Sequence, residues 1–512
     1  MYSFVHSAVI SGVKAEIVRV EIDISRGLPG FHIVGLAGKT VKESAKRVRS
    51  AIINSGFEWP IKKITVNLAP GNIQKYGSHF DLAIAAVLLE CSGQIKIKNR
   101  EKKIFAGELN LNGDLNKVKG VLAMLIEAEK NNIKEAVLAA ENQKETELIE
   151  NIDSYFLYNL SQLTDLIKVK NNNFFTRDIE EKNRVNRKDN YFELNFIRGQ
   201  HNAKRALITA AAGGHNLLFV GPPGCGKTIL AASIVKLLRP LSSQELLETA
   251  SIYSVSDNLE KLNFKKRYRP FVAPHHSITS AALIGGGRIP VPGEISLAHN
   301  GVLFLDELPE FKAAVLANLR EPLERKKIKI ARNNGSYIFP ANFQLIAAMN
   351  PCPCGYAGVK NKSCSCSERD IIKYQQKLSG PLLDRIDLQI EVPPLESEEI
   401  LLKSSQTKLI NYQEKIKNAR IMQAQRYKNS RLKNNSELEL KDIEKYCSLK
   451  RSAQKILKDA VKKINLSMRG YIRLMRVSRT IADLKSHHNI KKEDLIEAID
   501  FRWLAENSKM LY

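Results

Sequence analysis

Residues 221–228 read Gly-Pro-Pro-Gly-Cys-Gly-Lys-Thr, which fits the pattern G-x-x-x-x-G-K-[ST] of a phosphate-binding loop. Glycines let backbone N–H groups turn toward phosphate oxygens, and a helix starting at Lys227 would add its positive end. We expect Lys227 to reach the β- and γ-phosphates of ATP and Thr228 to bind Mg²⁺. An apolar strand precedes the loop and an apolar helix follows it, which makes a chance glycine-rich turn the weaker interpretation. The predicted nucleotide-binding residues are Gly221, Pro222, Pro223, Gly224, Cys225, Gly226, Lys227, Thr228 and Asp306, with Cys225 contributing backbone only.

Two further apolar stretches end in polar residues that suit the same chemistry. The apolar stretch 301–305 is followed by Asp306 and Glu307. Asp306 would be a second Mg²⁺ ligand, and Glu307 would polarise the attacking water. A helix cap is the alternative for two acids in this position. Residues 343–349 end in Asn350, which either orients the water or starts a turn with the proline that follows. Short buried strands alternating with helices predict a parallel α/β sheet.

Arginines in the last third of the chain are further catalytic candidates. Arg385 stands between two acids just before a strand, and it either forms a local ion pair or reaches the nucleotide of a neighbouring subunit. Arg469 begins a helix and could fold back over the phosphates. Arg473 and Arg476 of that helix would face acids or DNA.

Four of the seven cysteines lie within fifteen residues, in two C-x-C pairs at Cys352, Cys354, Cys364 and Cys366. They could hold one tetrahedral Zn²⁺, although the usual spacing is C-x-x-C. Reduced thiols on a loop are the alternative. Seven cysteines, four of them clustered, do not form a secreted disulfide framework, which suits a reducing compartment. The two adjacent histidines, His275 and His276, are assigned a structural or DNA-contacting role rather than a metal-binding one.

Length and charge bound the remaining possibilities. At roughly 100–200 residues per domain, 512 residues suggest three or so domains. The formal charge of +25, more than half of it within residues 401–512, fits nucleic acid as a partner, or else reflects only solvated surface lysines. Neither a membrane span nor a secretory signal is recognisable, so we expect a cytoplasmic protein with no membrane partner.

The pattern of elements divides the chain into four parts. Residues 1–168 read as an α+β domain, with two strands over 2–24, a helix over 40–55, a strand over 64–68 and apolar helices over 80–89 and 121–129. Residues 169–193 are polar and aperiodic and read as a linker. Residues 194–395 form the α/β core. Residues 396–512 read as a helical lid, with amphipathic stretches at 399–425, 452–464 and 470–484.

In this order the motifs resemble those of an AAA+ ATPase of the magnesium-chelatase-like group. The resemblance implies Walker A at 221–228, Walker B at Asp306 and Glu307, sensor 1 at Asn350, an arginine finger at Arg385 and sensor 2 at Arg469. The segments 273–295 and 327–340 resemble two inserts that touch DNA in ring-shaped relatives. By this resemblance, candidate DNA contacts are Arg288, Lys327, Lys329 and Arg332, with residues 333–335 at a hairpin tip. Surface loops without such a role are the alternative.

The amino-terminal stretches 27–37, 66–70 and 80–86 resemble the Lon-protease-like domain of the ComM/YifB family. Where Lon carries its nucleophilic serine, this chain has Phe80 or Asp81. The position of Lon's catalytic lysine falls near Leu122. Ser78 is not aligned to act, so we expect a non-proteolytic domain that contacts DNA or other subunits. The resemblance implies an ATP-dependent homo-hexameric helicase that catalyses branch migration during natural transformation and homologous recombination. Its expected partner is single-stranded or branched DNA. The alternative is a chaperone-like assembly ATPase similar to the magnesium chelatase ATPase subunit.

Overall fold

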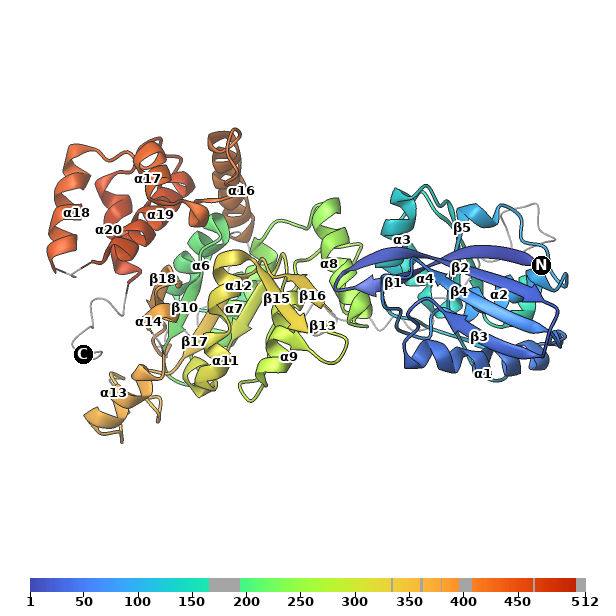
Figure 1. The fold of residues 1–512 in the computed structure, drawn as a ribbon. Helices are drawn as coiled ribbons and strands as arrows, with labels where there is room; N and C mark the ends of the chain where they lie inside the picture. Colours follow the sequence, from blue (N-terminus) through green and yellow to red (C-terminus); the bar gives the residue numbers. More distant parts are fainter. Residues whose placement is uncertain are drawn as a thin grey trace.

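The computed structural model describes residues 1–164, 194–332, 335–359, 362–378, 380–395, 408–463 and 466–502. The predicted linker at 169–193 lies outside these residues. The chain forms an amino-terminal α+β domain, then a parallel α/β core and then a group of helices. The molecule is elongated, with the core in the middle (Figure 1). This multidomain architecture agrees with the predicted fold class. No helix among the described residues is long and apolar enough to cross a membrane.

The amino-terminal domain is built on a mixed seven-stranded sheet of order β3-β4-β2-β1-β5-β8-β9. β1 and β2 form a long antiparallel hairpin in which Val5 faces Val20, and their alternating burial matches the predicted strand pattern. Helix α2 is buried on nearly all sides and therefore lies inside the domain. The bounds are β1 Tyr2–Ser11, β2 Lys14–Ser25, β3 Gly30–Val34, α1 Lys39–Asn54, β4 Lys63–Ala69, α2 Asp81–Cys91, β5 Lys103–Ala106, α3 Val121–Lys130, β8 Glu135–Ala139 and β9 Asp153–Leu157.

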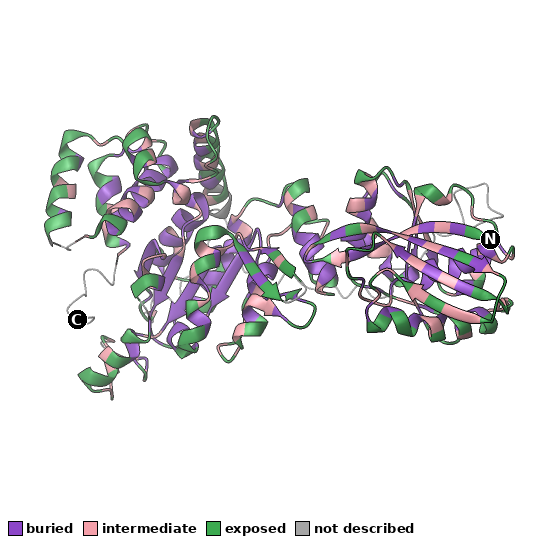
Figure 2. Ribbon diagram, viewed as in Figure 1, coloured by how far each residue is buried: buried purple, intermediate pink, exposed green. Residues whose placement is uncertain are grey.

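The core is a five-stranded, all-parallel sheet of order β11-β14-β17-β10-β18. Every residue of β10 and β14 is buried, because helices and other segments cover both faces of the sheet (Figure 2). β17 lies between β14 and β10, the strand before the phosphate loop, so the carboxyl ends of the three predicted strands meet at one edge. The bounds are α6 His201–Gly213, β10 Leu217–Val220, α7 Lys227–Leu237, α8 Ser243–Val255, β11 Phe271–Val272, β14 Val302–Leu305, β17 Gln344–Met349, α13 Glu368–Gln376, α14 Gly380–Leu383 and β18 Leu388–Glu391.

Two small hairpins project from the core where inserts were expected. β12 (Gly285–Gly286) pairs with β13 (Val291–Pro292), and β15 (Lys327–Arg332) pairs with β16 (Gly335–Pro340). In β15 the two isoleucines at 328 and 330 are buried while the lysines alternating with them are exposed. Residues 333 and 334 of the predicted hairpin tip lie outside the described residues.

The carboxy-terminal part is helical, as predicted. Its described helices are α16 Lys408–Arg426, α17 Leu440–Tyr446, α18 Arg451–Lys463, α19 Met468–Leu484 and α20 Lys492–Asp500. Residues 399–407 of the first predicted amphipathic stretch lie outside the described part of the chain. Helix α19 is central to this bundle. Its Arg479 is almost fully buried, and its guanidinium lies 3.0 Å from the carboxylate of Asp483 one turn later.

The amino-terminal domain packs directly on the core. The backbone N–H of Gly120 donates to the carbonyl of Ser254 in α8 at 3.2 Å, and Lys117 pairs with Asp257 at 2.7 Å. The turn between β1 and β2 lies against β16, where a side chain on Gly12 would come within 3.3 Å of the Ile338 carbonyl oxygen. One apolar cluster continues across this contact from α3 to α8 and β15. The amino-terminal domain therefore packs against both α8 and the hairpin of β15 and β16.

Candidate nucleotide-binding site

The phosphate loop connects the end of β10 to the start of α7, as the sequence pattern predicts. Gly224 and Gly226 adopt φ values of +78° and +90°, a left-handed conformation that glycine adopts without steric cost. Gly221 passes so close to the strand beside it that an added Cβ would lie 2.2 Å from the carbonyl oxygen of Val392. The loop is thus a tight backbone cradle leading into a helix amino terminus, the arrangement that binds phosphate.

Lys227 is buried, and its ammonium group points back into this cradle. Its Nζ donates to the carbonyl oxygens of Gly221 at 2.7 Å and Pro222 at 2.8 Å and to Oδ1 of Asn350 at 3.1 Å. Burial lowers the pKa of Lys227 from its ordinary value. The three oxygen acceptors are neutral, a longer contact of 3.8 Å goes to Sγ of Cys225, and no carboxylate of the described residues forms a salt bridge with Lys227. This environment fits the negative charge of a triphosphate.

Thr228 and Asp306 place two side-chain oxygens next to the phosphate loop, where a nucleotide-bound Mg²⁺ would lie. The Thr228 hydroxyl donates to Oδ2 of Asp306 at 2.7 Å, which joins the start of α7 to the end of β14. Oxygen ligands of this kind, together with phosphate oxygens, suit Mg²⁺. The residues present therefore fit the Mg²⁺–ATP complex, in which the metal ion neutralises charge on the β- and γ-phosphates.

Glu307 has an unusual backbone conformation and a partner that sequence analysis missed. Its φ is +52°, a rarely adopted left-handed value, and its N–H donates to Oδ1 of Asp306 at 2.9 Å. Its carboxylate lies 3.0 Å from Nδ1 of His276, in the loop after β11. The sequence assigned His276 a structural or DNA-contacting role. The structure gives it contact with the acid expected to polarise water.

Asn350 follows directly on β17, and its side-chain oxygen contacts Lys227. Because β17 lies between β10 and β14, its end is adjacent to both the phosphate loop and Asp306. The Cys225 side chain points inward and is buried, and this burial raises the pKa of its thiol. The geometry thus brings the predicted loop, acids and amide together at one edge of the sheet.

Arg385 and Arg469 lie at the opposite edge. Arg385 is three residues before β18, which runs parallel to β10, and its guanidinium pairs with Glu324. Arg469 approaches Asp384 at 3.7 Å, and Arg473 reaches the same carboxylate at 3.1 Å. The four residues of β10 span about 13 Å at ~3.3 Å per residue, which separates both arginines from the phosphate loop of their own chain. The expected fold-back of Arg469 over those phosphates is not the arrangement found here.

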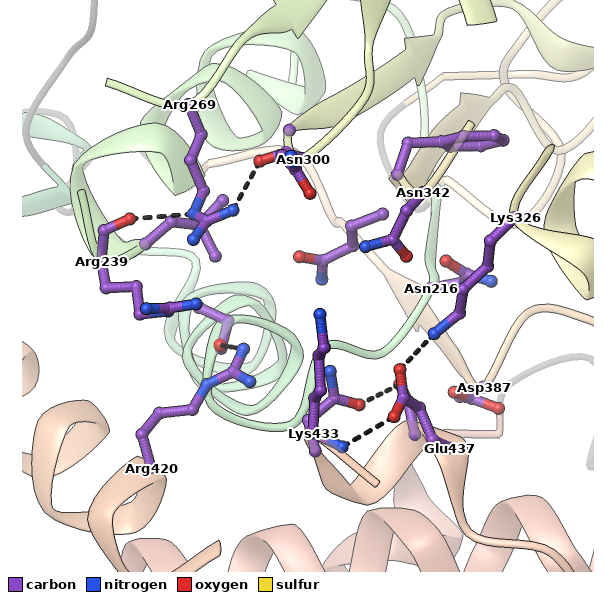
Figure 3. Close-up of a pocket in the computed structure, with 18 of the residues that line it drawn as sticks. Asn216, Arg239, Arg269, Asn300, Lys326, Asn342, Asp387, Arg420, Lys433 and Glu437 are labelled. Carbon is purple, nitrogen blue, oxygen red and sulfur yellow. Dashed lines mark hydrogen bonds and ion pairs between the residues drawn. The ribbon is translucent and has the colours of Figure 1, made fainter. Parts of the chain in front are cut away.

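A cavity of about 1650 Å³ opens on that same edge, between the core and the carboxy-terminal helices (Figure 3). Residues just before each of the five core strands line it, and so do Arg385 and Arg469. Inside it Arg269 donates to the carbonyl of Asn300 at 2.6 Å, and Lys326 pairs with Glu437. The large cavity is therefore distinct from the phosphate loop and belongs to the face that carries the predicted finger.

The candidate DNA-contacting residues lie on the two hairpins. Arg288, Lys327, Lys329 and Arg332 are all exposed. Arg332 joins the hairpins, because its Nε donates to the carbonyl of Gly287 at 3.3 Å. The four cysteines also come together, with their Sγ atoms within 4.8 Å of one another.

The amino-terminal domain has no serine–lysine pair at the positions that match Lon's catalytic residues, and its polar side chains there bond to other partners. The Ser78 hydroxyl donates to Glu108, and Phe80 and Leu122 are fully buried. Asp81 is buried as well and accepts a hydrogen bond from Arg47 at 2.7 Å. The positions matching Lon's nucleophile and lysine thus carry apolar side chains or a carboxylate already engaged by a cation.

Comparisons with known proteins agree with these features. Three family models match the chain. The model for magnesium chelatase, subunit ChlI, matches residues 193–400, and the model for subunit ChlI of Mg-chelatase matches residues 20–142. The model for the ChlI C-terminal region matches residues 407–502. Lon protease 2 of Bacillus subtilis is 26% identical over 178 residues, which cover 31% of this chain and 32% of that protease. The fold and site thus define a magnesium-chelatase-type AAA+ ATPase with a Lon-like amino-terminal domain.

Full-length relatives specify the family further. The competence protein ComM of Haemophilus influenzae is 44% identical over 504 residues, which cover 98% of this chain and 97% of the relative. YifB of Escherichia coli is 42% identical over 502 residues, with the same coverage. The chain belongs to the ComM/YifB family.

Proposed function

We propose that this protein is an ATP-driven, ring-forming motor on DNA, most simply a homo-hexameric helicase that migrates branches during natural transformation and recombination in the cytoplasm. The observation that carries this proposal is the separation of the phosphate loop from Arg385 by the full length of the core strands. A cation at the far edge of the sheet can act only on the nucleotide of another protomer. Repeating such a head-to-tail contact generates a ring when the rotation between neighbouring protomers closes on itself.

In this arrangement each ATP lies between two protomers. One contributes Lys227 to the phosphates, Thr228 and Asp306 to Mg²⁺, and Glu307 and Asn350 to the attacking water. Its neighbour contributes Arg385, with Arg469 beside it, to offset charge that develops on the γ-phosphate. Release of Arg385 from Glu324 would accompany assembly of this shared site.

DNA as the partner is supported by the exposed cations on the paired hairpins. Lys327 and Lys329 alternate with buried isoleucines, so both lysines lie on the exposed side of the paired strand β15. Such cations bind phosphates without reading sequence, which suits a motor that moves along DNA. A further point is the similarity to a protein named for competence, since competence is the capacity to take up DNA.

A second candidate is a chaperone-like assembly ATPase, favoured by family models of the magnesium chelatase ChlI subunit that match all three parts of the chain.

The rate of ATP turnover distinguishes the DNA motor from the assembly ATPase. It is measured with and without single-stranded, forked and four-way DNA at increasing salt. The motor predicts DNA stimulation that weakens with salt, because phosphate contacts release counterions. Glu307→Gln should bind ATP and DNA but lose turnover. Turnover that ignores DNA and depends on a protein client would favour the assembly ATPase.

A further inference from the structure

The cysteine cluster lies between two parts of the nucleotide site in sequence. It begins two residues after Asn350 and ends just before α13, whose first turn is capped by Ser367. Arg385 follows α13 and α14. The chain therefore passes from the water-orienting amide of one ATP site through the cysteine cluster to the finger proposed for the next site.

The four thiols converge with the spacing of a single tetrahedral centre. The Sγ atom of Cys352 lies 3.4 Å from that of Cys354 and 3.7 Å from that of Cys364, and the latter two are 3.5 Å apart. Four Zn–S bonds of ~2.3 Å in a tetrahedron place neighbouring sulfurs about 3.8 Å apart. A disulfide would need about 2.05 Å, and all four cysteines are free.

Backbone donors complete the surroundings that bound thiolates need. The N–H of Cys354 points to Sγ of Cys366 at 3.4 Å, and that of Ala357 points to Sγ of Cys352 at 3.3 Å. Hydrogen bonds of this kind offset negative charge on metal-bound sulfur and orient the ligands. An iron–sulfur cluster would put several iron and sulfide atoms between the thiolates, which this close spacing does not leave room for.

The cluster is also packed against the phosphate loop. A side chain on Gly355 would lie 2.5 Å from Cδ of Pro223, so the cysteine loop and the phosphate loop are in direct contact. On the other side, the Gln375 amide of α13 donates to the carbonyl of Pro351 at 3.0 Å. We propose that Cys352, Cys354, Cys364 and Cys366 bind one structural Zn²⁺ that fastens the end of β17 to the phosphate loop and to α13.

The test is the metal content of the full-length protein, purified with reductant and without chelator from zinc-supplemented culture. Mass spectrometry of the metal should find about one zinc per chain and no stoichiometric iron. Cys366→Ser, at a half-buried ligand, should lower this content at least about fivefold, whereas Cys91→Ser, at a buried cysteine of the amino-terminal domain, should leave it unchanged. Replacement of zinc by Co²⁺ should give the absorption of a tetrahedral, sulfur-ligated ion.

Wild-type protein without zinc, stoichiometric iron in its place, or full zinc content in Cys366→Ser would overturn the proposal. If Cys366→Ser does not fold, titration decides with wild-type protein alone. A mercurial reagent that blocks four thiols should release one zinc per chain, and thiols that react without releasing zinc would refute the site. None of these results depends on ATP turnover or DNA, so the zinc site can fail or hold separately from the proposed motor.

Discussion

Mixing two inactive variants, Lys227→Ala and Arg385→Ala, is expected to restore ATP hydrolysis. Lys227→Ala removes the buried ammonium from the phosphate loop, while Arg385→Ala removes a cation at least about 13 Å away across the sheet. Loss of an arginine finger costs about 10³-fold or more in turnover, so each variant alone should be nearly inactive. In a mixed ring, however, an intact loop from one variant can meet an intact finger from the other.

The size of the rescue follows from counting contacts. In rings assembled at random from equal amounts, about one contact in four combines an intact loop with an intact finger, so turnover should reach about a quarter of wild type if sites act independently. Steady-state phosphate release across mixing ratios measures this, with a maximum near equal amounts. The matched control mixes Lys227→Ala with Glu307→Gln, which lie at the same edge and cannot complement. Co-assembled rings that stay inactive at every ratio would refute the shared site.

Three further perturbations have defined outcomes. Lys329→Glu should weaken DNA binding and reduce its salt dependence, as measured by fluorescence anisotropy, while Lys265→Glu, at an exposed lysine that belongs to neither hairpin, should change both far less. Gly221→Ala should lower both ATP affinity by calorimetry and the melting temperature, because its methyl group would meet the Val392 carbonyl oxygen at 2.2 Å. Asp387 is buried, and although burial disfavours its charge, a 2.9 Å hydrogen bond from a buried histidine holds its pKa below the ordinary 3.8. Its stabilising contribution should therefore be full above 3.8 and fall as the pH drops below that value. Asp387→Asn should flatten this acid limb in urea unfolding, and an unchanged slope would contradict the assignment.

The parts of the fold that sequence predicted are those determined locally. Strands β10, β14 and β17 are short apolar runs whose ends carry the phosphate loop, Asp306 and Asn350, so strand and site residue appear in one stretch of sequence. Parallel pairing then places the three ends at one edge of the sheet, and the strand order found in the structure makes them neighbours. The long hairpin of β1 and β2 follows in the same way from alternating burial around a glycine turn.

The contacts that sequence did not predict join segments far apart in the chain. His276 meets Glu307 only because the loop after β11 passes the end of the neighbouring strand β14. The sequence allowed Arg469 to fold back over the phosphates, because a helix start alone does not say which edge of the sheet it faces. In the structure its guanidinium lies 3.7 Å from the carboxylate of Asp384, at the other edge. The docking of Gly120 on α8 likewise depends on shape complementarity between two domains.

The most direct test of the account follows DNA movement itself. Forked and four-way junctions carrying a donor and an acceptor dye on opposite arms report strand separation in real time by energy transfer. We predict loss of energy transfer with wild-type protein and ATP, on the same time scale as phosphate release, and none with Glu307→Gln although it binds ATP and the junction. Vigorous ATP turnover by the wild type with every junction left intact would contradict the central claim that hydrolysis between protomers moves DNA.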